Sequence, residues 1–415
     1  MRPKTLIKRG KIVKILFTSP IIEHPAAGGP QLRIENSIKA LSKVSELYVV
    51  SRSTKWDTGG DDAVNFYSSL VKNFCFAPSV NGLSKNRYIS KLQRIFRFIK
   101  KPALEQDIDC LVNIIDREKI EIIWFGYGNI TFDLIKLLKK TRPNLKIVCD
   151  TDSVWSRFLL RELPYETDER RIAKIKKEGL TKEKEEQEWV NICDITTAVS
   201  EVDADYYKNL ASDPSRVMLF SNVIDMNNYT QEVSMPVNIK TPNIYLAGSF
   251  GPKSAMDKAA RWFIEDIYPI IKKEIPRIHF YIIGRGSKET LLDIKDESIS
   301  ILGKVESVLP YLKYASVSLV PLKFESGTRF KIMEAAACKI PIVSTELGAE
   351  GIPITDGVDI LISDEANEFA QSVIKIIKDE KLADHISENC FKLISEKNSV
   401  DSLTHEARKI LKRLG

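Results

Sequence analysis

Histidine and cysteine are both scarce in this chain of 415 residues, which has 4 histidines and 6 cysteines. None of the cysteines lies in a Cys-x-x-Cys pair, so the sequence argues against a disulfide framework or a zinc site and favours a reducing cytoplasm. No apolar run approaches the roughly 20 residues that cross a bilayer. The basic first residues alternate with short apolar pieces, which is not the pattern of a secretory signal.

Acidic residues are missing from residues 63–104, although the net charge of the whole chain is only +6. The segment Ser84–Lys101 within this stretch contains the basic residues Lys85, Arg87, Lys91, Arg94, Arg97, Lys100 and Lys101. A basic amphipathic helix is typical of attachment to an anionic membrane surface. The alternative is an ordinary helix whose apolar face packs on a sheet. Nucleic acid is not the expected partner, because no nucleic-acid-binding module accompanies the charges.

Short apolar segments alternate with amphipathic ones along the whole chain, and its length suggests two domains of roughly 200 residues. Alternation of this kind predicts an α/β protein with parallel, doubly wound sheets. The polar segment Asp225–Pro242 lacks periodicity and is the expected linker. The expected strands are Lys14–Ser19, Leu47–Val50, Ile120–Phe125, Leu145–Asp150, Ile195–Ser200, Val217–Phe220, Asn243–Leu246, His279–Ile283, Ile299–Leu302, Val317–Leu322 and Pro341–Thr345.

Ligands of such sheets bind beyond the carboxyl ends of the strands, so the loops that follow strands are the candidate binding loops. Gly28 and Gly29 follow the first strand and would let a ligand approach the backbone, or they form a plain turn. Ser249 and Lys253 lie in a similar loop of the second half, where Lys253 would reach an anion or stay in solvent. Gly284 and Arg285 end a later strand, and Val305 lies in the loop after the next one.

Two carboxylates, Asp150 and Asp152, lie at the end of the strand expected at Leu145–Asp150. One residue apart, they could share a metal ion, or they could simply end the strand and cap a helix. The sequence favours the second interpretation.

The segment Phe324–Thr345 combines a polar start with an Ala-rich helical pattern, and the helix is expected at Thr328–Cys338. Its apolar positions Phe330, Met333, Ala336 and Ala337 would face a sheet. Thr328, Arg329, Lys331 and Glu334 would then lie at the free end. A helix start offers unpaired N–H groups and a partial positive charge, so this segment could hold a phosphate. The alternative is a capped helix with solvated charges.

Several segments in their order along the chain resemble GT-B glycosyltransferases, most closely the retaining enzymes of family 4. The resemblance rests on GGPQLRIENSIKAL, DITTAVSEVDADYY, LFSNVIDMNNY, AARWFIEDIYPIIKKEIPRIHFYIIGRG and VPLKFESGTRFKIMEAAACKIPIVSTELGAEGI. It implies two Rossmann-like domains whose parallel sheets face across a cleft. The expected domains are 1–235 on the acceptor side and 236–395 for the donor, and residues 396–415 would form a helix that returns to the first domain.

The resemblance also implies roles for individual residues. Glu334 would bind the ribose of the donor. The backbone amides of Gly327, Thr328, Arg329 and Phe330 would hold its diphosphate, and the loop that contains Val305 would contact the base. Ser326, with Glu325 beside it, takes the place of a glutamate that contacts the transferred sugar in relatives.

This chain departs from the family at two further positions. Ser249 stands where relatives carry an arginine, and Arg329 with Lys331 would supply the missing charge without a metal. Asp150, Thr151 and Asp152 stand where many relatives carry a histidine that contacts the sugar. Either one of the two carboxylates would replace it or the acceptor chemistry would be altered.

The expected function is transfer of a sugar from a nucleoside diphosphate sugar to a hydroxyl of a growing or lipid-linked glycan, with no cofactor and no metal. Domain closure would exclude water from the reaction. The alternatives are a GT-B sugar-nucleotide epimerase and a catalytically silent GT-B interaction protein, because a fold does not fix function. The expected location is the cytoplasm, with attachment to the inner face of the membrane.

Overall fold

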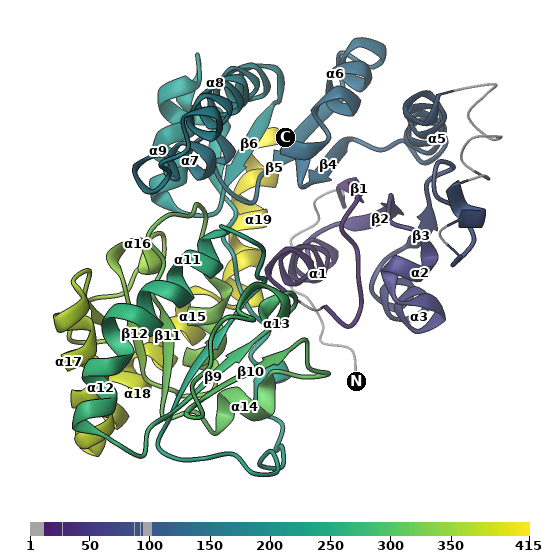
Figure 1. The fold of residues 1–415 in the computed structure, drawn as a ribbon. Coiled ribbons are helices and arrows are strands. Elements are labelled where there is room, and N and C mark those ends of the chain that lie inside the picture. Colours follow the sequence, from purple (N-terminus) through teal and green to yellow (C-terminus); the bar gives the residue numbers. More distant parts are fainter. Residues whose placement is uncertain (1–11, 27, 87, 92, 94–101) are drawn as a thin grey trace.

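The computed structural model describes residues 12–26, 28–86, 88–91, 93 and 102–415, and within them the chain forms two α/β domains (Figure 1). Each domain is built on one parallel sheet. The first sheet has the order β3-β2-β1-β4-β5-β6-β7 and the second has the order β10-β9-β8-β11-β12-β13. The doubly wound arrangement expected from the alternating pattern is therefore present in both halves.

The bounds of the strands in the first sheet are β1 (Lys14–Ser19), β2 (Glu46–Ser51), β3 (Asn73–Phe76), β4 (Ile122–Gly126), β5 (Lys146–Asp150), β6 (Ile195–Ala198) and β7 (Val217–Leu219). Those of the second sheet are β8 (Asn243–Ala247), β9 (His279–Ile283), β10 (Ile299–Gly303), β11 (Val317–Val320), β12 (Ile342–Ser344) and β13 (Leu361–Ile362). The sequence pattern missed β3, which is short and lies at the edge of its sheet, and β13, which has only two residues.

The helical segments of the first half are α1 (Gly29–Ser42), α2 (Lys55–Thr58), α3 (Gly60–Leu70), α5 (Ala103–Glu118), η1 (Gly128–Ile130), α6 (Phe132–Thr141), α7 (Trp155–Leu160), η2 (Leu163–Tyr165), α8 (Glu169–Ile192), α9 (Glu201–Leu210) and η3 (Pro214–Arg216). Those of the second half are α10 (Asn227–Thr230), α11 (Ala255–Trp262), η4 (Phe263–Ile267), α12 (Tyr268–Glu274), α13 (Ser287–Thr290), α14 (Leu309–Lys313), α15 (Phe330–Ala337), α16 (Glu346–Ala349), α17 (Ala366–Lys378), α18 (Glu380–Lys397) and α19 (Val400–Leu414).

Successive residues of β1 face opposite sides of the first sheet, as the two-residue period of a strand requires. Ile15 and Phe17 join the apolar cluster that contains residues of α1 and α19, whereas Leu16 joins the cluster on the other face with α5 and α6. Both faces of the strand are buried, which is why its sequence reads as a continuous apolar run rather than as an alternation.

The last helix, α19, packs on the first domain although the preceding α18 belongs to the second (Figure 1). Leu403, Ala407 and Ile410 of α19 lie in the same apolar cluster as the β1 residues Ile15 and Phe17. Where the chain returns, Ile224 and Ser399 form a parallel β-bridge, and the Ile224 amide donates to the Asn398 carbonyl at 3.0 Å. The two crossings between the domains therefore run side by side.

The helical segment between β8 and β9 is interrupted in the structure. It begins at Ala255, forms a π-helical turn at η4 and continues as α12. Pro269 lies in the first turn of α12 and has no N–H to donate to the preceding turn, which accounts for the local change in winding. No described helix is both long enough and apolar enough to cross a membrane.

Candidate functional site

The two domains meet through the loops that follow β5 and β11, at the carboxyl edges of their sheets. The Val154 amide of the first domain donates to the Ser326 hydroxyl of the second at 3.3 Å. Gly327 has a φ of +76°, and a Cβ atom there would lie 2.8 Å from the Asp152 carbonyl oxygen. A side chain at this position would force the loops apart, so the junction requires glycine.

The glycine loop after β1 also reaches the second domain. Gly29 is the first residue of α1, and a Cβ atom there would lie 2.8 Å from the ring of Phe330. Gly28 precedes it with a φ of +121° and is exposed. Phe330, the first residue of α15, packs on the apolar cluster of the second domain as expected, and its ring also lies against Gly29. The close contact explains why the sequence has a glycine at position 29.

Two carboxylates from different domains influence each other at this junction. Asp152 accepts hydrogen bonds from Asn129 Nδ2 at 2.7 Å and from Trp155 Nε1 at 3.2 Å. Burial raises the pKa of Asp152 and also that of Glu325, whose pKa the negative charge of Asp152 raises further while Arg329 and Lys331 lower it. Glu325 Oε2 is buried and has no hydrogen-bond partner among the described residues.

Asp150, by contrast, is fully buried beneath the junction. It pairs with the equally buried Arg33 and accepts a hydrogen bond from Thr197 Oγ1 at 2.6 Å. Arg33 also donates to Asn222 Oδ1 at 2.8 Å. Asp150 and Asp152 therefore have separate partners, and no cluster of three or more potential metal ligands occurs in the described part of the chain. This arrangement leaves Asp152 as the carboxylate that can take the expected place beside the sugar.

The α15 helix starts at Phe330, two residues later than expected, and Arg329 is its N-cap. The Arg329 guanidinium is buried and donates to the carbonyls of Ser326 and Gly327. Burial lowers its pKa, while Glu325, Glu350 and Asp203 oppose this effect. The side chain thus lies in the domain interface and not at the free end of the helix. Thr328 is buried as well and accepts from Asn222 Nδ2 at 2.6 Å.

Lys331 and Glu334, three residues apart on α15, contact α11 and α10, respectively. Lys331 Nζ lies 3.0 Å from Met256 Sδ, and within the described residues it forms no ion pair. Burial, aided by Arg329, lowers the pKa of Lys331 to about 8, although Glu325 and Glu334 oppose this shift. Glu334 accepts a hydrogen bond from the Tyr229 hydroxyl at 2.9 Å, and burial raises its pKa.

The loops after β8 and β9 pack backbone to backbone. A Cβ atom at Gly284, which has a φ of +138°, would lie 1.7 Å from the Gly248 carbonyl oxygen, and the Phe250 amide donates to the Arg285 carbonyl at 2.8 Å. Glycine at 284 is therefore required by this contact. The other predicted donor residues of this edge are the exposed Ser249, Lys253 and Arg285 and the half-buried Val305.

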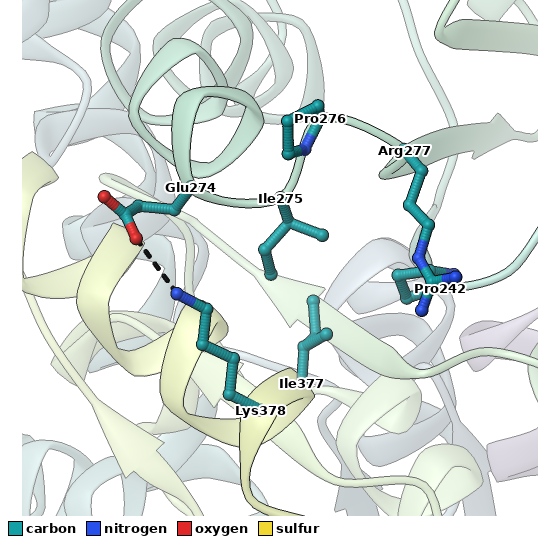
Figure 2. Close-up of a pocket in the computed structure, with 7 residues that line it drawn as sticks. All are labelled: Pro242, Glu274, Ile275, Pro276, Arg277, Ile377 and Lys378. Atoms are coloured by element: carbon teal, nitrogen blue, oxygen red, sulfur yellow. Dashed lines mark hydrogen bonds and ion pairs between the residues drawn. The ribbon is translucent and has the colours of Figure 1, made fainter.

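A separate hollow of about 430 Å³ lies at the opposite, amino-terminal edge of the second sheet (Figure 2). Its lining residues are Pro242, Glu274, Ile275, Pro276, Arg277, Ile377 and Lys378, and Glu274 pairs with Lys378 at 2.9 Å. Pro242 directly precedes β8, so the hollow is remote from the domain junction and from every predicted site residue.

Of the predicted membrane-facing residues, the structure describes Lys85 and Lys91, both exposed, whereas Arg87, Arg94, Arg97, Lys100 and Lys101 lie outside the described residues. Tyr88 of this segment is 83% exposed, and its neighbour Ile89 is 49% exposed. These two side chains do not pack on the sheet.

Sequence reasoning missed several residues that the structure places at the junction. Tyr229 and Met256 contact Glu334 and Lys331, and Arg161, just beyond α7, donates to the Glu325 carbonyl at 2.8 Å. Tyr229 is the last residue of the segment LFSNVIDMNNY, but the resemblance assigned no role to it. Arg161 lies in a charged segment where the pattern does not distinguish it from solvated residues.

Residues 241–379 match the sequence profile of the family described as "Glycosyl transferases group 1". An uncharacterized glycosyltransferase of Methanocaldococcus jannaschii is 27% identical over 145 residues, which are 33% of this chain and 41% of that protein. The match thus spans about two fifths of the relative's length.

Two solved structures are similar over nearly the whole chain. HepE of Anabaena, in complex with UDP and glucose, superposes with a TM-score of 0.64 at 11% identity and covers 96% of this chain and 99% of its own. Sucrose-phosphate synthase of Thermosynechococcus elongatus has a TM-score of 0.67 at 14% identity and covers 97% and 99%. The expected GT-B fold and the resemblance to GT-B glycosyltransferases are therefore confirmed. The narrower assignment to family 4 stays a prediction.

Proposed function

With the GT-B fold and a group 1 glycosyl transferase match over residues 241–379 as premises, we propose that this protein is a retaining glycosyltransferase. It moves a sugar from a nucleoside diphosphate sugar to a hydroxyl of a growing or lipid-linked glycan. The observation that carries the proposal is that Lys331 and Glu334 lie one helical turn apart on α15 without forming an ion pair with each other. A half-buried lysine without an ion-pair partner suits a phosphate, and a carboxylate with one oxygen bound to Tyr229 has the other available for a ribose hydroxyl.

In the proposed reaction, the bond between the anomeric carbon and the β-phosphate oxygen breaks while the acceptor oxygen bonds to that carbon. The acceptor proton passes to the departing phosphate oxygen. Lys331 stabilises the negative charge that develops on the diphosphate, which is the role of a preorganised cation at a leaving group. Lys253 and the backbone amides of the 327–330 segment are the other candidate contacts of the diphosphate.

Asp152 and Glu325 are the proposed contacts of the transferred sugar. They come from different domains, and their raised pKa values show that each carboxylate is incompletely compensated by the protein. Sugar hydroxyls that donate hydrogen bonds would provide that compensation. The site would then be complete only when both domains contribute to it.

A donor panel tests the proposed function. Purified protein is incubated with nucleoside diphosphate sugars and candidate acceptors, nucleotide release is measured, and the product anomer is assigned by NMR. We expect acceptor-dependent release, which Lys331→Met and Glu334→Gln should reduce. Lys339→Met, just beyond the carboxyl end of α15, should leave it unchanged. Interconversion of the donor sugar without an acceptor would instead indicate an epimerase, and no binding of any nucleotide would indicate a silent protein.

We also propose that the reaction needs no metal ion, because Lys331 supplies the positive charge, and Asp150 and Asp152 at the end of β5 have separate partners. Turnover should therefore survive EDTA. Loss of turnover that manganese or magnesium restores would overturn this part of the proposal.

We propose that the acceptor-side domain attaches to an anionic membrane surface. Lys85 and Lys91 are exposed beside the apolar Tyr88 and Ile89, and Lys85 Nζ lies 5.9 Å from the ring of Trp56, which is 47% exposed. Basic and aromatic side chains together suit a charged interface, where each basic residue contributes on the order of 1 kcal/mol.

Vesicle sedimentation tests this attachment. Binding to anionic vesicles should weaken with salt and in Lys85→Glu/Lys91→Glu, but not in the matched control Lys176→Glu/Lys177→Glu on α8. Equal binding to neutral and anionic vesicles would contradict it.

A further inference from the structure

The segment after β5 extends from the first domain onto the second. Arg161, just beyond α7, forms a two-pronged pair with Glu350 at 2.7 and 2.8 Å, and the same guanidinium donates to the Glu325 carbonyl at 2.8 Å. The side chains of Arg161 and Glu350 are only 21% and 22% exposed. A bidentate, partly buried pair fixes geometry far better than a surface ion pair does.

Other charges and rings of both domains surround this pair. Arg157 lies 3.5 Å from Glu350 and 3.8 Å from Asp203, and the buried Arg329 is influenced by Glu325, Glu350 and Asp203. On the outer side, the ring of Tyr165 stacks on Phe324 at 5.7 Å, and Lys258 donates to the Tyr165 carbonyl at 2.7 Å. The contact is therefore an extended interface that includes the donor-loop residues 324–329.

Three consecutive carbonyls of this loop are bound by two guanidinium groups. Arg161 binds the Glu325 carbonyl, and Arg329 binds those of Ser326 and Gly327. In a trans peptide each N–H points opposite to the preceding carbonyl, so the following amides are directed away from the guanidinium groups. The amides of Gly327 and Thr328 have no hydrogen-bond partner in the described structure. Successive free amides of this kind form an anion-binding concavity.

We propose that Arg161 is a positioning residue through which the first domain sets the orientation of the donor loop in the second. Arg329 belongs to the same domain as the loop and would bind it whether the two domains are close together or apart. Arg161 belongs to the first domain and can bind the loop only when the domains are close together. Donor binding and domain approach would then be coupled, each favouring the other. This inference rests on the proposed function, because it takes a nucleoside diphosphate as the anion that the loop binds.

The test compares Arg161→Ala with Arg171→Ala, a matched control on α8 that removes an arginine whose ion-pair partners among the described residues, Glu162 and Glu166, belong to its own domain. Calorimetry with UDP as the probe measures affinity, and small-angle X-ray scattering measures the radius of gyration with and without UDP. For Arg161→Ala we expect an affinity about tenfold lower, as loss of a charge-assisted contact implies, and a larger radius of gyration without UDP. The control should match the wild type in both.

The exchange Arg161→Glu/Glu350→Arg distinguishes a role of Arg161 in orienting the donor loop from a role in merely holding the two domains together. It should restore the radius of gyration through the reversed ion pair but not the affinity, because a glutamate cannot donate to the Glu325 carbonyl. Equal UDP affinity in Arg161→Ala and Arg171→Ala would overturn the inference. If the wild type itself binds no UDP, the proposed donor class fails, and an unchanged radius of gyration in Arg161→Ala would separately overturn the role of Arg161 in domain approach.

Discussion

Lys331 offers the sharpest test of the donor site, because its charge should change within an accessible pH range. Its pKa of about 8 makes it mostly protonated at pH 7 and mostly neutral at pH 9.5. A bound diphosphate would hold the proton and raise this pKa. Affinity for UDP should therefore be constant below pH 8 and fall by up to tenfold for each pH unit above it. The phosphates themselves contribute no change there, since their last pKa lies near 6.

The magnitude of the effect follows from the single contact that is lost. A hydrogen bond to a charged group contributes about 1.5–3 kcal/mol. Lys331→Met should thus weaken UDP binding by about 10- to 150-fold at pH 7 and abolish the pH dependence between 7 and 9.5. Lys339→Met, just beyond the carboxyl end of α15 and paired with Glu388, should change neither.

Calorimetry in two buffers of different ionisation enthalpy checks the mechanism directly. At pH 8 the wild type should take up about half a proton for each UDP bound, because about half of the free protein carries a neutral Lys331. Lys331→Met should take up none. Affinity of the wild type that stays constant from pH 7 to pH 9.5 would refute the assignment of Lys331 to the diphosphate.

Three further perturbations test the junction. Gly29→Ala should place a Cβ atom against Phe330 and reduce donor turnover, whereas Gly29→Ala/Phe330→Ala should recover part of it in the same assay. Arg33→Met should leave Asp150 as an unpaired buried charge and lower the free energy of unfolding by about 3–5 kcal/mol, measured by urea denaturation. Burial raises the pKa of Asp203 to about 6, so the folded state binds more protons than the unfolded state between pH 4 and 6, and stability should fall as pH rises through that window. Asp203→Asn should remove this dependence, and a denaturation series at pH 4, 5 and 6 checks it.

The fold was predictable because both faces of the central strands are buried. Lys14–Ser19 and His279–Ile283 contain uninterrupted apolar residues at 15–17 and 280–283, and their expected bounds are those of β1 and β9. The short edge strand β3 and the two-residue β13 carry too few buried side chains to give a pattern. The spacing of apolar residues could not predict the π-helical turn either, because a single residue, Pro269, accounts for it.

The candidate site was predictable only in outline. The position of strand-following loops indicated the correct edge of each sheet, but the direction of each side chain depends on residues distant in sequence. Arg329 turns into the interface because Glu325, Glu350 and Asp203 surround it there. Asp150 stays buried beneath the junction because it forms an ion pair with the buried Arg33. Neither effect can be read from the local sequence, in which Arg329 and Lys331 look equivalent.

The return of α19 to the first domain has a consequence for the order in which the protein folds during synthesis. Leu403, Ala407 and Ile410 complete the apolar cluster beneath β1, yet the ribosome delivers them only after the entire second domain has been made. The first domain to be synthesised is thus the last to be finished, and until then the α1 face that α19 covers stays exposed to water. The second domain, whose strands and covering helices are contiguous in sequence, can fold in the meantime and hold the chain in the arrangement that α19 needs to dock.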